Sequence, residues 1–115
     1  MDRSYAARTA TRKAELDLAV AAVLVACRDL DDIRAVYAFG SYGRDDVGPT
    51  SDLDLLVVRE TNERRALRDR DLRLAYFGRV ALDIVVVTPS EYRDLLPKTS
   101  MGRTILRDAR RLDAA

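Results

Sequence analysis

The chain has 115 residues, which is enough for one domain, spanning 1–115, with a modest hydrophobic core. Its 20 basic and 19 acidic residues nearly cancel, so the net charge of +1 gives no reason to expect a nucleic-acid partner. The lack of histidine excludes histidine-based triads and histidine-ligated zinc, so any catalysis must use carboxylates, hydroxyls, arginines and a bound ion. The single cysteine, Cys27, excludes an internal disulfide and favours a reducing compartment, here the cytoplasm.

The first predicted element is a helix over residues 7–30, where apolar residues recur at three- and four-residue spacing. Leu18, Ala22 and Val25 lie off that stripe, so the helix is apolar on more than one face. These side chains are expected to be covered either by the domain itself or by a partner or second copy. The apolar run from Leu18 to Cys27 has ten residues, whereas a membrane span needs about 20, so no membrane location is expected.

The rest of the chain continues to alternate strands and helices. Apolar runs rich in β-branched residues predict strands at 33–39, 53–58 and 80–87. Between the first two strands, a short helical turn is predicted after Gly40, and a loop over 45–51 is marked by its Gly-Pro-Thr sequence. One charged, solvated helix and two shorter helices are predicted at 62–76, 91–96 and 99–109. This order of elements predicts the α/β class.

Acidic residues interrupt two of the predicted strands. Asp52 and Asp54 point to the same side of their strand because side chains alternate, and Asp83 is the lone charge in another apolar run. An acid-x-acid pair alone is uninformative, since the chain has four such pairs and about three are expected by chance. Two neighbouring carboxylates resist ionisation, however, and a divalent cation between them removes that penalty. If the second and third strands are neighbours, the three carboxylates converge at one edge of the sheet; otherwise each is a strand-end residue facing water.

Magnesium suits such a carboxylate cluster. It takes a few carboxylates and completes its octahedron with water and with phosphate oxygens of a substrate. The sheet is expected to hold the acids rigidly and to keep competing water away from them.

The Gly-Ser pair after the first strand is compatible with the same chemistry. Gly40 allows backbone N–H groups to approach an anion closely, and the start of a helix favours negative charge. Ser41 adds a hydroxyl donor, and Arg44 lies one turn further on the same face, where a guanidinium can bind phosphate oxygens. The alternative is an ordinary strand-to-helix turn with a capping serine.

These residues together resemble a known family. Gly40-Ser41, ten further residues and then Asp52-Leu53-Asp54 resemble the G-S-x10-D-x-D signature of the DNA polymerase beta-like nucleotidyltransferases. The continuation from Ser51 to Val58 is similar to the smallest branch of that superfamily, the minimal nucleotidyltransferases (MNT), which include the antitoxins of MNT–HEPN toxin–antitoxin pairs. The resemblance covers nearly the whole chain. It implies an α/β (α+β) fold with a small mixed sheet of three to four strands flanked by helices.

The resemblance also implies roles for individual residues. Asp52 and Asp54 would hold two magnesium ions on a nucleoside triphosphate, with ATP as the donor. Asp83 would hold the second ion and help to deprotonate the attacking hydroxyl. The remaining residues assigned to nucleotide binding are Gly40, Ser41, Arg44 and Ser51, the first two contacting the β- and γ-phosphates. One departure from the family is Asp45, where relatives often have glycine; with Asp46 it adds negative charge near the triphosphate.

The function implied is magnesium-dependent transfer of AMP from ATP to a hydroxyl of a partner protein, a HEPN-type toxin for which the chain would be the antitoxin. One alternative is a binding module that silences the toxin by docking without catalysis. Another is a nucleotidyltransferase for small molecules, although such enzymes usually carry an additional helical domain for the acceptor. The sequence also leaves undecided whether the chain forms a homo-oligomer.

Overall fold

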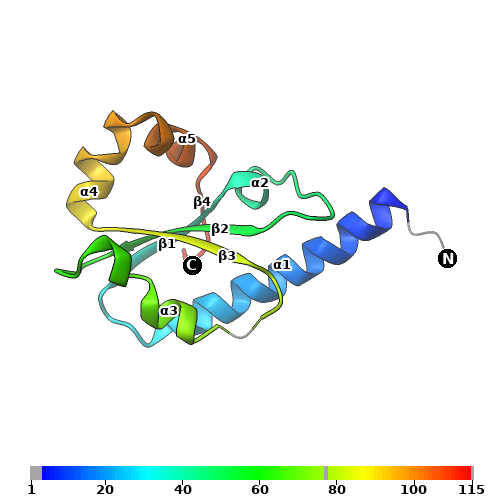
Figure 1. Cartoon of the computed structure of the whole chain (residues 1–115), viewed down its shortest axis with the longest axis horizontal. Coiled ribbons are helices and arrows are strands. Elements are labelled where there is room, and N and C mark those ends of the chain that lie inside the picture. The colour runs from blue at the N-terminus through cyan, green and yellow to red at the C-terminus, as the bar shows by residue number, and fades with distance from the viewer. Residues whose placement is uncertain (1–3, 77, 115) are drawn as a thin grey trace.

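The computed structural model describes residues 4–76 and 78–114, and its centre is a four-stranded mixed sheet. The sheet order is β3-β2-β1-β4, in which β1 pairs antiparallel with β2 and β4, and β2 pairs parallel with β3. The strands are β1 (Ile33–Phe39), β2 (Leu53–Arg59), β3 (Leu82–Val87) and β4 (Arg110–Arg111). The predicted mixed sheet flanked by helices is confirmed (Figure 1).

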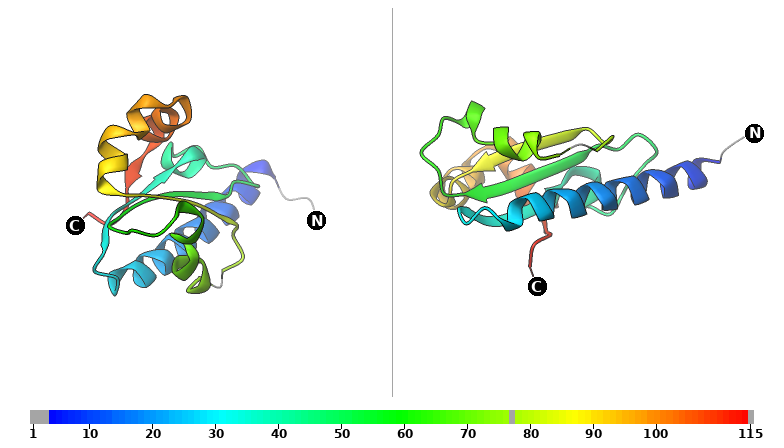
Figure 2. Two further views of the ribbon diagram at one scale, coloured as in Figure 1. Left: turned by 60° about the vertical axis from the view of Figure 1, so that its left-hand side comes forward. Right: turned by 90° about the horizontal axis from the view of Figure 1, so that it is seen from below.

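Helices cover the two faces of this sheet. In Figure 1, α1 (Tyr5–Arg28) lies below the sheet, whereas α4 (Pro89–Asp94) and α5 (Ser100–Asp108) lie above it. The left view of Figure 2 shows the same separation from another direction. The shorter helical elements are α2 (Gly40–Gly43), α3 (Arg70–Leu74) and two 3-10 turns, Arg65–Leu67 and Leu96–Lys98.

The side chains of β2 alternate between two hydrophobic cores. Leu53, Leu55 and Val57 pack in the core that contains the buried residues of α1. Leu56 and Val58 belong to the opposite core, which includes Leu96 and Ile105 beside α4 and α5. Since side chains alternate along a strand, Asp54 projects from the face that α4 and α5 cover.

α1 is a 24-residue helix whose first turn is capped by Ser4, because the serine hydroxyl accepts a hydrogen bond from the N–H of Ala7 at 3.0 Å. Its inner face buries four side chains: Leu16, Ala19, Val23 and Cys27. On its outer face, Leu18 is 74% exposed and Val25 is 55% exposed. The expectation that the domain itself covers these residues is therefore wrong. Among the described residues, no helix has the length and hydropathy that a membrane span requires.

The single helix predicted over 62–76 is also wrong, because this segment forms only a 3-10 turn and the five-residue α3. Leu72 is the one buried side chain of α3. A single buried side chain stabilises a long helix too little. Arginines hold the segment instead: Arg68 donates to the Val86 carbonyl at 3.3 Å, and Arg73 donates to the Leu82 carbonyl at 2.9 Å. These two guanidiniums cap backbone carbonyls of β3, which is an edge strand.

The C-terminal part follows the prediction more closely. Thr88 and Glu91 form a capping box at the start of α4, and Thr99 caps α5 by accepting from the N–H of Gly102 at 2.9 Å. The short strand β4 was not predicted, since two arginines pairing with Tyr37 and Ala38 carry no strand pattern.

Candidate functional site

The acids of the signature meet at the beginning of two adjacent strands. Asp54 is the second residue of β2, Asp83 is the second residue of β3, and the two are direct partners in the parallel register. Direct partners in a sheet project from the same face. Asp52 lies just before β2. The expectation that the two strands are neighbours is confirmed.

These carboxylates lie at an open surface rather than in a shielded interior. Asp52 and Asp83 are exposed and Asp54 is half-buried, so the expectation that the sheet keeps water away from all three is wrong. Burial raises the pKa of the Asp54 carboxyl, and the nearby negative charges of Asp83 and Asp52 raise it further. Arg44 acts on the same carboxyl in the opposite direction. Four signature residues therefore share one electrostatic environment.

The acids as they stand are not arranged as a metal site. Within residues 4–76 and 78–114, no group of three or more His, Cys, Asp or Glu side chains is arranged to hold a metal ion. The donor chemistry nevertheless suits magnesium, because all available ligands are carboxylate oxygens and their mutual repulsion is relieved by a cation. Asp54 and Asp83 would be the ligands fixed by the sheet, and Asp52 would add a third from the end of the loop.

Gly40 brings the backbone directly against the Asp54 carboxylate. Its φ is +62°, in the left-handed region that favours glycine, and a Cβ atom at this position would collide with Asp54 Oδ2. The preceding residue, Phe39, is the register partner of Asp54 across β1 and β2. Any larger residue at position 40 must therefore displace the acid.

Tyr42 anchors the short helix α2 to the first helix. Its side chain is buried, and its hydroxyl donates to Asp17 Oδ1 in α1 at 2.6 Å. The Arg110 guanidinium lies 5.1 Å from the centre of the Tyr42 ring and donates to the Tyr42 carbonyl at 3.1 Å. Burial and the neighbouring Asp17 raise the pKa of Tyr42 to about 12, so this hydroxyl stays protonated and keeps donating at neutral pH. Ser41 is carried on the same half-buried turn.

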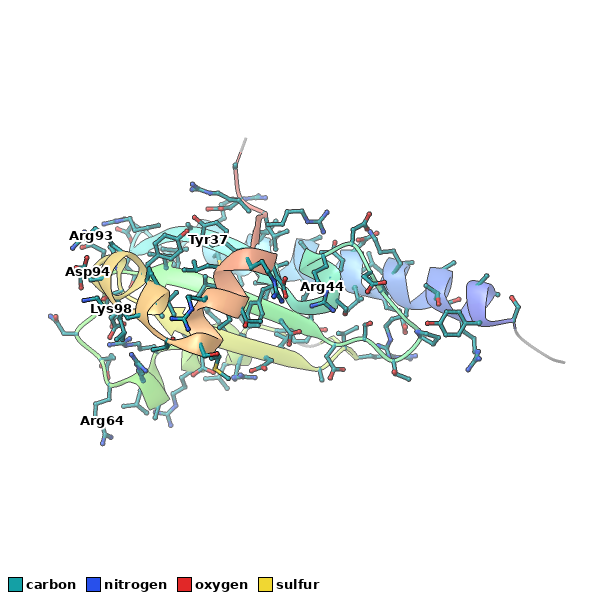
Figure 3. All side chains as sticks on the ribbon, turned by 90° about the horizontal axis from the view of Figure 1, so that it is seen from above. Tyr37, Arg44, Arg64, Arg93, Asp94 and Lys98 are labelled. Carbon is teal, nitrogen blue, oxygen red and sulfur yellow. The ribbon has the colours of Figure 1, made fainter. Side chains whose placement is uncertain are left out.

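Arg44 is held by an acid that the sequence interpretation missed. Its Nη1 donates to Asp108 Oδ2 at 3.0 Å, and the Arg107 Nε donates to the other carboxylate oxygen at 3.1 Å. The Asp108 side chain is 5% exposed, whereas that of Arg44 is 45% exposed. The pKa of Asp108 is lowered by Arg107 and by Arg44. Figure 3 shows Arg44 beside the end of α5.

A signal for Asp108 was present in the sequence. An acid in the last turn of a helix is unfavourable beside the negative end of the helix dipole, and therefore suggests a specific partner. Arg44, the partner of Asp108, is brought close to it by the preceding residue, Gly43. A Cβ atom at Gly43 would lie 2.6 Å from the Ala38 carbonyl oxygen and 2.7 Å from that of Asp108. This close packing joins α2, β1 and the end of α5.

Ser51 shapes the loop that leads to the acids. Its hydroxyl accepts from the N–H of Gly48 at 2.9 Å, and its own N–H donates to the Gly48 carbonyl at 3.2 Å. Arg12 of α1 donates to the Pro49 carbonyl at 3.2 Å and ties this loop to the helix. The structure thus gives Ser51 a role in the turn, and its contact with a nucleotide stays a prediction.

The backbone at Asp45 has a conformation that favours glycine, the residue that the family resemblance leads one to expect there. Asp45 has a φ of 57°, a left-handed conformation that glycine adopts without cost and that aspartate tolerates better than most residues. Its side chain and that of Asp46 are exposed.

Comparison with known proteins gives one family match and one fold match. Residues 20–112 match the model of a family described as the nucleotidyltransferase domain. A similar fold occurs in a crystal structure of a protein from Sulfolobus solfataricus assigned as a nucleotidyltransferase, with a TM-score of 0.65 and 22% sequence identity. That match covers 96% of this chain and 89% of the other, and at this identity it supports the fold alone. No curated protein matched the chain.

Proposed function

Because the chain belongs to the nucleotidyltransferase domain family, we propose that it transfers AMP from ATP to a hydroxyl group in a magnesium-dependent reaction. The observation that carries this proposal is the pairing of Asp54 and Asp83 in register on adjacent parallel strands. The backbone at Gly40 lies directly against the first of these acids. Two acids fixed by a sheet beside a glycine turn suit a triphosphate that is held through divalent ions.

In the proposed reaction, the acceptor oxygen bonds to the α-phosphorus of ATP as the bond to the pyrophosphate oxygen breaks. Asp83 takes the proton of the attacking hydroxyl, and Arg44 donates hydrogen bonds to phosphate oxygens and offsets their charge. Asp52, Asp54 and Asp83 would hold the magnesium ions, which when bound stabilise negative charge on the entering and leaving oxygens.

A groove lined in part by β3, the strand that carries Asp83, supports an acceptor that belongs to another protein. It has a volume of about 340 Å³ and begins at Val85, two residues further along the same face of β3. Its other side is formed mainly by apolar residues of the α4–α5 region, including Leu96, Met101 and Ile105. An apolar groove beside an exposed acid suits a protein segment that carries the acceptor hydroxyl. By resemblance to the MNT–HEPN pairs, the partner that carries this segment would be a HEPN-type toxin, and the chain would be its antitoxin.

The proposal is tested by co-expressing the chain with the protein encoded beside it and measuring the mass of that partner. We expect the partner to gain one or more AMP groups, and purified components to transfer label from α-labelled ATP when magnesium is present. The same pair with Asp54→Asn should show neither. A partner that stays unmodified under saturating ATP and magnesium, while its toxicity is still suppressed, would favour docking without catalysis.

A small-molecule acceptor is distinguished in the same assay. If pyrophosphate is released with aminoglycosides or other small polyols while all proteins keep their mass, the transfer chemistry stands and the protein acceptor is wrong. If no pyrophosphate is released with any acceptor, the enzymatic proposal fails.

A further inference from the structure

The outer face of α1 carries an apolar stripe. Ala14, Leu18, Ala21 and Val25 are all exposed and follow one another at four-, three- and four-residue spacing. Leu18, a large apolar side chain, is 74% exposed to water. Single exposed apolar residues are ordinary, but residues at this spacing fall on one face of the helix. The inner face of α1 is already buried against the sheet, so this second stripe needs a different cover.

The stripe faces away from the acids. α1 packs on one side of the sheet, and Asp54 projects from the side that α4 and α5 cover. The view from below shows α1 in front (Figure 2, right), whereas the view from above shows α5 in front (Figure 3). A molecule bound along the outer face of α1 therefore leaves the acid site open.

The apolar surface also extends beyond the helix. A pocket of about 310 Å³ lies beside the stripe, lined by Leu18, Ala22, Tyr76 and Val80 among others. The surface to be covered is thus wider than one row of side chains.

Opposite charges flank the two ends of the stripe: Glu15, which also pairs with Arg12 at 3.7 Å, lies beside Leu18, and Arg28 lies one turn beyond Val25. Leu18 and Val25 are equally far from the point between Ala21 and Ala22, and so are Glu15 and Arg28, which carry opposite charges. If a second α1 lies antiparallel about this point, each Leu18 lies opposite a Val25. Each Glu15 then lies at the same level along the helix axis as an Arg28 of the other copy, which it reaches where the two helices cross at an angle. A parallel arrangement would instead place like charges together.

We propose that the chain forms a twofold-symmetric dimer in which the outer faces of two α1 helices pack antiparallel. The contact is isologous, because the same patch on each copy covers the other. Alanines near the crossing point let the two helix backbones come close, as interaxial distances depend on the side chains at the contact. Glu15 to Arg28 spans about 20 Å of helix at 1.5 Å per residue, so the interface is at the small end for proteins. We therefore expect a dimer that dissociates on dilution.

The first test is sedimentation equilibrium of the full chain over a wide concentration range. We expect a reversible monomer–dimer equilibrium that Leu18→Glu shifts strongly toward monomer. Leu18 is largely exposed, so this variant should keep the unfolding midpoint that the wild type has at concentrations where it is monomeric. Met101→Glu is the matched control, since Met101 is 75% exposed but lies on α5. A monomer at every concentration, or a dimer that Leu18→Glu leaves unchanged, would overturn the proposal.

The second test addresses the register and orientation. Glu15→Arg and Arg28→Glu should each weaken the dimer, and the double reversal should restore it. In a Cys27→Ala background, Ala21→Cys should cross-link to its own copy with a short bifunctional maleimide, whereas Ala14→Cys should not. Efficient cross-linking of Ala14→Cys with itself, or no rescue by the double reversal, would reject the antiparallel arrangement. Neither test depends on nucleotidyl transfer.

Discussion

Arg44 and Asp108, 64 residues apart, form an ion pair with a distance of 3.0 Å between Nη1 and Oδ2. The arginine belongs to the signature region and lies within electrostatic reach of Asp54, whereas the aspartate is almost completely buried at the end of α5. A buried acid paired with a half-exposed guanidinium orients the guanidinium, because only one of the two side chains is free to move. Asp108 is therefore expected to position Arg44 for phosphate binding.

Asp108→Asn should raise the KM for ATP by roughly tenfold, the low end of the range for residues that orient a binding group, and should change kcat much less. Arg107→Gln is the control, because Arg107 also pairs with Asp108 but its side chain is 70% exposed. The effects of Asp108→Asn and Arg44→Ala on ATP affinity should not add in a double-mutant cycle. Fully additive effects would mean that Asp108 acts on the fold alone.

The raised pKa of Asp54 predicts how stability depends on pH. The folded state holds the Asp54 proton more tightly than the unfolded state, whose carboxyl titrates near the usual value of 3.8. As pH rises from that value through the folded pKa, the unfolded state releases the proton first and the folded state loses stability. Asp54→Asn removes this loss. Without divalent metal, its unfolding temperature should exceed that of the wild type at neutral pH, by a margin that shrinks as pH falls toward 3.8.

Added magnesium should reverse this order. Binding to the folded state raises the unfolding temperature of the wild type by mass action, and Asp54→Asn should gain much less. Thermal unfolding by circular dichroism measures both effects. A margin that grows as pH falls would show that the sign of the pKa shift is wrong.

Asp83→Asn should impair the chemical step more than ATP binding, because its proposed work is to take a proton from the acceptor hydroxyl. Single-turnover transfer should fall by about 10²–10⁴-fold, the usual range for a general base, while ATP affinity changes less. An unchanged single-turnover rate with a large loss of ATP affinity would make Asp83 a binding residue.

Two substitutions of Asp45 separate the effect of its charge on ATP binding from the effect of its backbone conformation on stability. Asp45→Asn removes the negative charge and keeps a residue that tolerates a φ of 57°, so it should lower the KM for ATP without loss of stability. Asp45→Ala also removes the charge but should cost about 1–2 kcal/mol of stability, since alanine is strained in this conformation. Chemical denaturation and initial-rate kinetics separate the two effects. Equal KM values for wild type and Asp45→Asn would show that this carboxylate does not act on the triphosphate.

Local pattern alone determined the strands β1, β2 and β3 and the acids that two of them carry. β1 was predicted with the observed bounds, because a β-branched run ending at a glycine is informative within seven residues. The convergence of Asp54 and Asp83 also followed from sequence once their strands were taken as neighbours, since the side-chain period of two sets the face. Gly40 was singled out for close backbone approach, and the group that comes close within the protein is Asp54.

Tertiary structure decided what depends on contacts between distant segments. The pairing of Arg44 with Asp108 requires α5 to pack against α2, and no local pattern encodes that distance. The segment predicted as one helix over 62–76 is interrupted, and its Arg68 and Arg73 donate to backbone carbonyls of β3. These contacts form only in the folded protein, where β3 is an edge strand. The sequence showed that Leu18, Ala22 and Val25 lie off the inner stripe of α1, but not that they are exposed, because apolar periodicity identifies a face without saying what covers it.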